Sequence, residues 1–189
     1  MGRLARVVGG VAVALAAVAG LGAGLGAGPA AAKVLDAAPQ GFTIENVEVV
    51  PGAPMAAWRA LVDKVGLWWP DAHTWFGKAA NLSIQAKAGG CFCEIEGERQ
   101  VEHMRVAFVD PGRMLRMLGG LGPLQGMGLH GALDWTFEPV PEGTRITLRY
   151  RVGGYATEDL PKFAAVVDKV QAQQLGGLAA HIRQAAAKP

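Results

Sequence analysis

Hydrophobic and polar residues alternate along the middle of the chain, between residues 81 and 152. Eight consecutive positions show the pattern most clearly, in the order Arg145, Ile146, Thr147, Leu148, Arg149, Tyr150, Arg151 and Val152. Successive side chains of a strand point to opposite faces, so this alternation predicts strands with one buried face and one face in water. Segments with glycine or proline divide the region, at 89–90, 97, 110–112, 119–131 and 141–143. The pattern predicts an antiparallel meander.

Helical periodicity lies on both sides of this meander. A predicted strand at 42–50 is followed by apolar residues at helical spacing from Pro54 to Gly66, and by a short second helix or turn at 68–70. After residue 154 the period is again helical over about 25 residues, with an apolar stripe formed by Phe163, Val166, Val167, Val170, Leu175, Leu178 and Ile182. Together these elements predict an α+β fold with its helices on one face of an antiparallel sheet.

The long C-terminal helix carries two local signals. Thr157 or Asp159 is its expected N-cap, with Pro161 in the first turn. Gly176 and Gly177 lie in its interior, where each glycine costs about 1 kcal/mol relative to alanine. We interpret the glycine pair as a kink or a point of close packing rather than as a gap that faces a ligand.

The first 32 residues differ in composition from the rest of the chain. Arg3 and Arg6 form a basic start, an apolar stretch follows, and Ala30 to Ala32 supply the small residues of a cleavage site. We interpret 1–32 as a secretory signal peptide cleaved after Ala32, 33–40 as a linker and 41–187 as one domain. The expected location is the periplasm or the cell exterior. A retained membrane anchor is the alternative; after cleavage no stable membrane span is expected.

The net charge and the spacing of the histidines indicate which kinds of partner this chain is suited to bind. The signal peptide would carry away 2 of the 18 basic residues and none of the 16 acidic ones, which leaves 16 of each. A neutral chain without a basic cluster is poorly suited to nucleic acid, so no nucleic-acid partner is predicted. The 4 histidines have no metal-site spacing. Neither a metal nor a cofactor is therefore predicted.

Several motifs in 42–185 resemble, in order and spacing, the START-like (SRPBCC) superfamily, and most closely the branch related to the heat-shock-protein ATPase activators. The superfamily also includes birch-pollen allergens and polyketide cyclases. The residues that carry the likeness are the early 50–54 segment with Trp58, Trp68-Trp69-Pro70, Gly89-Gly90-Cys91-Phe92-Cys93-Glu94, and the segments 109–115, 135–138 and 143–148. The resemblance implies a helix-grip fold, in which a curved sheet of about seven strands grips the long helix. It also implies a cavity for an apolar or amphipathic small molecule.

Candidate ligand contacts are Trp75, Met104, Trp135 and Tyr150. The last three belong to predicted inward faces, as does Phe108 beside Met104 and Val106, although such residues can equally fill a core. The glycine-rich segment 119–131 is expected to be either a mobile flap over the cavity or a disordered loop.

Glu94 and His130 are the candidates for a polar anchor or an acid–base group. If Phe92 points inward then Glu94 does too, but the outward orientation is slightly preferred, because Glu96 shares that face and burying two carboxylates is costly. His103, like His130, is expected to be a surface or partly buried residue.

Cys91 and Cys93 are separated by one residue and would lie side by side on a strand. Their Cα atoms would be about 7 Å apart on a regular strand, which is long for a disulfide. A bridge formed in an oxidising compartment, two inert thiols, or part of a Cu(I) site all remain open, the last with less support because further ligands are not evident.

The leading functional hypothesis is an exported protein that binds a hydrophobic small molecule between sheet and helix. One alternative is an enzyme of the cyclase or dehydrase type that uses Glu94 or a histidine to move a proton. A further alternative, implied by the ATPase-activating relatives, is a co-chaperone-like interaction module.

Overall fold

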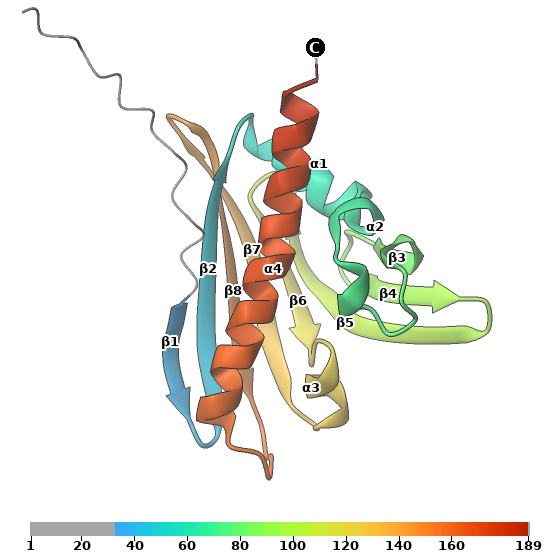
Figure 1. The fold of residues 1–189 in the computed structure, drawn as a ribbon, viewed down its shortest axis with the longest axis vertical. Coiled ribbons are helices and arrows are strands. Elements are labelled where there is room, and N and C mark those ends of the chain that lie inside the picture. The colour runs from blue at the N-terminus through green and yellow to red at the C-terminus, as the bar shows by residue number, and fades with distance from the viewer. Residues whose placement is uncertain (1–32, 189) are drawn as a thin grey trace, which may run out of the picture.

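The computed structural model describes residues 33–188 as an antiparallel sheet crossed by one long helix (Figure 1). The eight strands are β1 (Lys33–Ala38), β2 (Gly41–Val50), β3 (Leu82–Ile84), β4 (Cys91–Glu96), β5 (Arg99–Asp110), β6 (Met114–Gly119), β7 (His130–Val140) and β8 (Gly143–Gly153). They are ordered β1-β2-β8-β7-β6-β5-β4-β3 across the sheet. The predicted α+β class is confirmed, and the arrangement fits a helix-grip fold.

The helices cover one face of this sheet. They are α1 (Pro54–Asp63), α2 (Val65–Trp68), α3 (Pro123–Gly126) and α4 (Leu160–Ala186), with 3₁₀ turns η1 (Asp71–His73) and η2 (Ala79–Asn81). The helix predicted from Pro54 to Gly66 is divided at Lys64 into α1 and α2. Among the described residues, no helix is long and apolar enough to cross a bilayer.

The strand count exceeds the predicted number of about seven. The additional strand, β1, lies in the segment that was expected to be a linker, and it pairs antiparallel with β2. The predicted signal peptide lies outside the described residues. β1 thus begins at Lys33, before the predicted domain start at residue 41.

The core lies between α4 and the inner face of the sheet. Apolar residues of β7 and β8 alternate inward as predicted and are buried, namely Leu133, Trp135, Phe137, Ile146, Leu148, Tyr150 and Val152. The predicted inward position of Phe108 is wrong. A bulge in the pairing of β5 with β6 shifts the alternation after Val106, so Phe108 is 47% exposed and Val109 packs against the core instead.

The N-cap and one residue of the glycine pair that the sequence indicates in α4 both have a structural role. The Asp159 side chain caps the helix by accepting from the backbone N–H of Lys162 at 3.2 Å. Near the middle, a Cβ atom on Gly177 would lie 2.5 Å from the carbonyl oxygen of Trp68. Gly177 thus permits the close packing of α4 on α2, whereas a Cβ on Gly176 would meet nothing within 4 Å.

Alanine substitutions should separate these two glycines. Gly177→Ala should lower the free energy of unfolding by about 1–3 kcal/mol, because the added methyl group forces α4 away from α2. Gly176→Ala is the matched control and should raise it by about 1 kcal/mol through helix propensity alone. Urea unfolding of both variants measures the difference, and equal stabilisation by both would contradict the close contact at Gly177.

Candidate functional site beside the long helix

A cavity of about 360 Å³ lies between the first half of α4 and two connecting segments. The wall residues outside α4 are Trp69, Ala72, His73, Thr74, Trp75, His103, Leu121, Gly122, Pro123 and Leu124. Those of α4 are Phe163, Val166, Val167, Val170, Gln171 and Gln174. Trp75 and Val166 are each 54% exposed and therefore lie at its solvent edge. Apart from the two histidines, no wall residue is ionisable.

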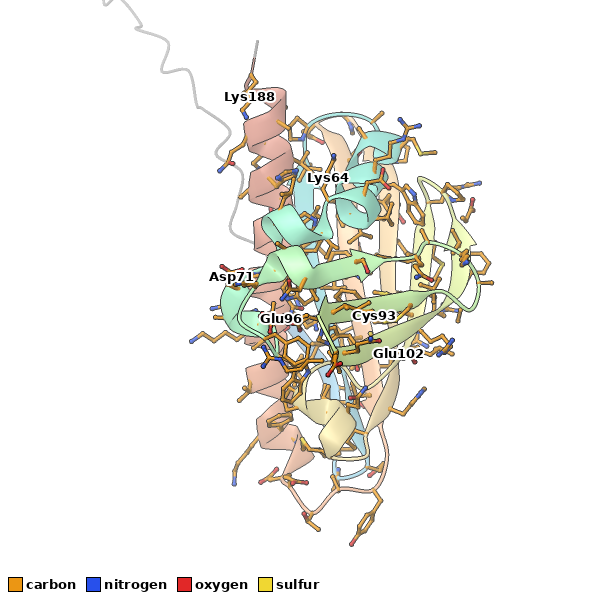
Figure 2. All side chains as sticks on the ribbon, turned by 90° about the vertical axis from the view of Figure 1, so that its right-hand side faces the viewer. Lys64, Asp71, Cys93, Glu96, Glu102 and Lys188 are labelled. Atoms are coloured by element: carbon orange, nitrogen blue, oxygen red, sulfur yellow. A yellow bond between two sulfur atoms is a disulfide. The ribbon has the colours of Figure 1, made fainter. Side chains whose placement is uncertain are left out.

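The segment between α2 and β3 supplies one side of the cavity and folds through its own hydrogen bonds. Asp71, labelled beside α4 in Figure 2, accepts from the backbone N–H of Ala79 at 2.7 Å. The indole Nε1–H of Trp69 donates to the carbonyl oxygen of His73 at 3.0 Å. These contacts give the segment its shape without a regular element longer than one turn.

The Glu94 carboxylate connects this segment to the sheet. It accepts from the backbone N–H groups of Trp75 and Phe76, at 2.8 and 2.7 Å, and contacts Nε2 of His103 at 3.2 Å. The preferred outward orientation is therefore wrong: Phe92 and Glu94 point inward and are buried, and the cysteines lie on the other face. The cost of burying the carboxylate is offset by three donors, and those donors come from other segments.

His103 is also buried, contrary to the expectation of a surface or partly buried residue. Its strand neighbour Met104 is buried as well, because a bulge in the pairing of β4 with β5 leaves His103 without a partner residue and turns both side chains inward. Burial lowers the pKa of His103, and the hydrogen bond and charge of Glu94 partly oppose this shift. We assign the shared proton to Nε2, because the Glu94 carboxylate accepts from two backbone N–H groups as well; this tautomer leaves Nδ1 as a lone-pair acceptor without a partner among the described residues.

Of the four predicted ligand contacts, only Trp75 lines the cavity. Met104, Trp135 and Tyr150 are at most 1% exposed and belong to the packed core. Tyr150 acts on the cavity indirectly: its hydroxyl donates to the carbonyl oxygen of Gly119 at 2.8 Å and accepts from the N–H of Leu121 at 2.9 Å. Burial raises the pKa of Tyr150 to about 12, so the hydroxyl keeps its proton.

The other two histidines that could serve as acid–base groups differ in where they lie. His130 is exposed at the start of β7 and does not line the cavity. His73 does line it, and burial lowers the pKa of His73. The glycine-rich segment, expected to be a flap or a disordered loop, folds around α3. Its Gln125 side chain donates to the carbonyl oxygen of Glu102 at 2.7 Å, which attaches α3 to β5.

Gln171 and Gln174 are the wall residues that sequence reasoning missed. They are only 2% and 3% exposed, and the Oε1 atom of each has no hydrogen-bond partner among the described residues. Both lie one helical turn apart within the apolar stripe of α4. Two glutamines at positions of the helix where apolar residues are expected were the sequence signal that could have pointed to this site.

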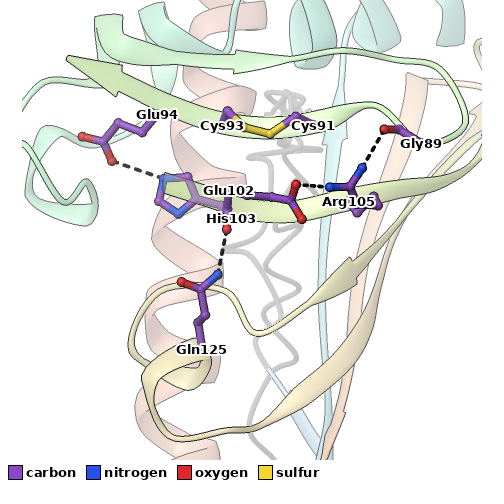
Figure 3. Close-up of a disulfide and its surroundings, with 8 residues drawn as sticks. All are labelled: Gly89, Cys91, Cys93, Glu94, Glu102, His103, Arg105 and Gln125. Carbon is purple, nitrogen blue, oxygen red and sulfur yellow. Dashed lines mark hydrogen bonds and ion pairs between the residues drawn. A yellow bond between two sulfur atoms is a disulfide. The ribbon is translucent and has the colours of Figure 1, made fainter. Parts of the chain in front are cut away.

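A disulfide joins Cys91 and Cys93 on the outer face of β4 (Figure 3). Their Cα atoms are 5.4 Å apart, closer than on a regular strand and within the range of a bridge. The bridged alternative is thus the one that the structure has. Within residues 33–188, no three histidine, cysteine or acidic side chains are grouped to hold a metal ion.

Comparisons with known proteins identify a shared fold. No protein-family model and no curated protein matches the chain. An uncharacterised protein from Rhizobium leguminosarum aligns with a TM-score of 0.57 and 14% identity over 77% of this chain and 96% of that one. CalU16 from Micromonospora echinospora gives 0.53 and 14% over 82% and 84%, and Aha1 from Colwellia psychrerythraea gives 0.53 and 16% over 75% and 96%. Likeness at this identity extends to the fold alone.

One buried histidine, His103, and one half-buried histidine, His73, predict how stability depends on pH. Because burial lowers their pKa values below the ordinary value of 6.5, the unfolded chain binds protons at a pH where the folded chain does not. Their contribution to stability is complete above that value and is lost as the pH falls through the folded pKa values. The dependence comes mainly from His103, which contributes at most about 1.4 kcal/mol per pH unit, because solvent screens the more exposed His73.

His103→Gln should therefore flatten the decline of the unfolding temperature on acidification, measured by circular dichroism between about pH 8 and pH 5. His130→Gln, at an exposed position, is the matched control and should leave the slope unchanged. An unaltered slope in His103→Gln would show that its protonation is not coupled to folding.

Proposed function

We propose that this chain is an exported SRPBCC-type protein that binds a hydrophobic or amphipathic small molecule in the cavity beside α4. The observation that carries the proposal is the cavity itself, whose volume is in the range of small-molecule sites. Its wall is mostly aliphatic and aromatic. The site lies against one side of α4 rather than in the middle of the helix–sheet interface, which core side chains fill.

Three buried polar groups give the cavity its specificity. Gln171, Gln174 and His103 line it, and each has a polar atom that lacks a partner among the described residues. Unpaired buried polar atoms are costly, and a guest with a polar end can satisfy them after a rotation of the amide groups. The proposed guest therefore has an apolar body and an uncharged polar group, because the wall offers no fixed cation to pair with an anion.

Filling the cavity should abolish binding without unfolding the protein. Val170 is a half-buried wall residue, and Val170→Trp places an indole in the space. We expect the affinity for N-phenyl-1-naphthylamine, a neutral fluorescent probe, to fall about tenfold or more. Ala165→Trp adds a tryptophan at an exposed position of the same helix and should leave probe affinity unchanged.

Fluorescence titration with circular dichroism of both variants makes the comparison. Equal affinity of the wild type and Val170→Trp, or no probe binding by the folded wild type, would remove the basis of the binding proposal.

Export has its own support and its own test. The composition of residues 1–32 and a disulfide partly open to solvent are both typical of proteins in oxidising compartments. Expression of the full chain in a bacterium should yield a product in the periplasm or medium that begins at Lys33, by N-terminal sequencing. Ala32→Arg should prevent cleavage. Accumulation of uncleaved wild type in the cytoplasm would contradict export.

The second candidate function is an enzyme of the cyclase or dehydrase type, favoured by the pairing of Glu94 with His103. The carboxylate orients the imidazole, and Nδ1 is the nitrogen left to accept a proton from an acidic O–H or C–H group of a guest. In this alternative, His103→Gln would retain the probe and lose turnover. The co-chaperone alternative is supported only by the fold likeness to Aha1, and no contact in the described residues favours it.

A further inference from the structure

The Cys91–Cys93 disulfide contributes little to the stability of the fold. Only Phe92 separates the two cysteines. A disulfide stabilises mainly by restricting the unfolded chain, and the effect grows with the length of the closed loop. A loop with a single intervening residue is the weakest case, and the two strands on either side of β4 already hold it in place. The bond therefore calls for an explanation other than stability.

Both cysteines lie where a reagent can reach them. They are half-buried on the outer face of β4, opposite the side that carries Phe92 and Glu94, and neither lines the cavity. Their neighbour Ile95 on the same face is 48% exposed. On the side of β3, the residue paired with Cys93 is Ser83, which is exposed and uncharged. A partner would thus approach from solvent without displacing the core.

The two cysteines face side chains of opposite charge on β5. Cys91 pairs in register with Arg105, and Cys93 pairs with Glu102 (Figure 3). Directly opposed side chains on antiparallel strands have Cβ atoms about 5 Å apart, close enough for an electrostatic effect. Arg105 also forms an ion pair with Glu102 and donates to the carbonyl oxygen of Gly89 at 3.1 Å, so its guanidinium lies between Glu102 and the turn before Cys91. A cation favours the thiolate of Cys91, and an anion disfavours that of Cys93.

We propose that Cys91 and Cys93 form a thiol–disulfide exchange site for an external dithiol, with Cys91 as the thiolate that is released first. A thiolate of the dithiol attacks Sγ of Cys93, the Sγ–Sγ bond breaks, and Cys91 leaves as a thiolate beside Arg105. The second thiolate of the partner then attacks its own sulfur in the mixed disulfide and releases Cys93. The partner is oxidised to a disulfide, and the two cysteine thiolates take up two protons. In the reverse sequence the reduced protein reduces a disulfide partner: the Cys93 thiolate attacks the partner, and the Cys91 thiolate then attacks Sγ of Cys93, releases the partner as a dithiol and re-forms the bond.

Reduction of the folded protein tests the site. The mature protein is equilibrated with reduced and oxidised dithiothreitol, quenched in acid, and labelled with N-ethylmaleimide for mass spectrometry. We expect two labels per chain with an unchanged circular dichroism spectrum, because the bond is accessible and adds little stability. Labelling that requires denaturant, or loss of the native spectrum on reduction, would overturn the proposal.

Single-cysteine variants test the assignment of Cys91. Cys93→Ser leaves Cys91 alone, and Cys91→Ser leaves Cys93 alone. At neutral pH and low salt, iodoacetamide should alkylate Cys91 about threefold faster or more, equivalent to roughly half a pH unit in thiolate formation. Adding Arg105→Gln to Cys93→Ser should remove most of this advantage.

Arg145→Gln is the matched control for that substitution. It removes an exposed arginine from β8, which β7, β6 and β5 separate from β4, and it should leave the rate unchanged. Equal rates for the two thiols, or equal effects of the two arginine substitutions, would overturn the assignment of Cys91. This inference does not depend on the proposed binding function.

Discussion

The buried carboxylate of Glu94 is the group on which the cavity depends. An ionised side chain without exposure is tolerated only when donors surround it, and Glu94 takes its donors from two backbone N–H groups and one imidazole. These donors belong to the segment after α2 and to β5. Satisfying one charge therefore fixes the position of one cavity wall and the orientation of His103 together. It also fixes which face of β4 is outward, and so places the disulfide in contact with solvent.

Alternation along the strands was sufficient to predict the sheet, but it failed where the strands depart from regular pairing. β7 and β8 are regular, and every predicted inward residue on them is buried. β5 has a bulge at each of its two pairings. One turns His103 inward and the other turns Phe108 outward, and neither leaves a mark in the sequence, because a bulge depends on how the partner strands meet. The error at Glu94 has another cause: β4 alternates regularly around it, but alternation does not say which face is inward, and the donors that permit burial of its carboxylate come from other segments.

The candidate site was harder to predict than the fold for a separate reason. Alternation indicates which residues point inward, but not whether the interior at that point is filled. Met104, Trp135 and Tyr150 point inward as expected and are enclosed by other side chains. Trp75 lines the cavity because it belongs to the segment after α2, which forms one of the walls. Gln171 and Gln174 interrupt the apolar stripe of α4, which is visible in the sequence, but that they line a cavity depends on what packs against α4.

The position of the cavity follows from the relative widths of a helix and this sheet. A helix with its side chains is about 10–12 Å across, and neighbouring strands are about 4.8 Å apart, so one helix covers roughly two or three strands. In Figure 1, α4 runs along β2, with which it is in contact, while β4 and β5 extend away from it. Shorter pieces must cover those strands: α1, α2, the segment after α2, and the α3 segment held by Tyr150. Irregular pieces pack less completely than a continuous helix, and the space remains where they meet the first half of α4.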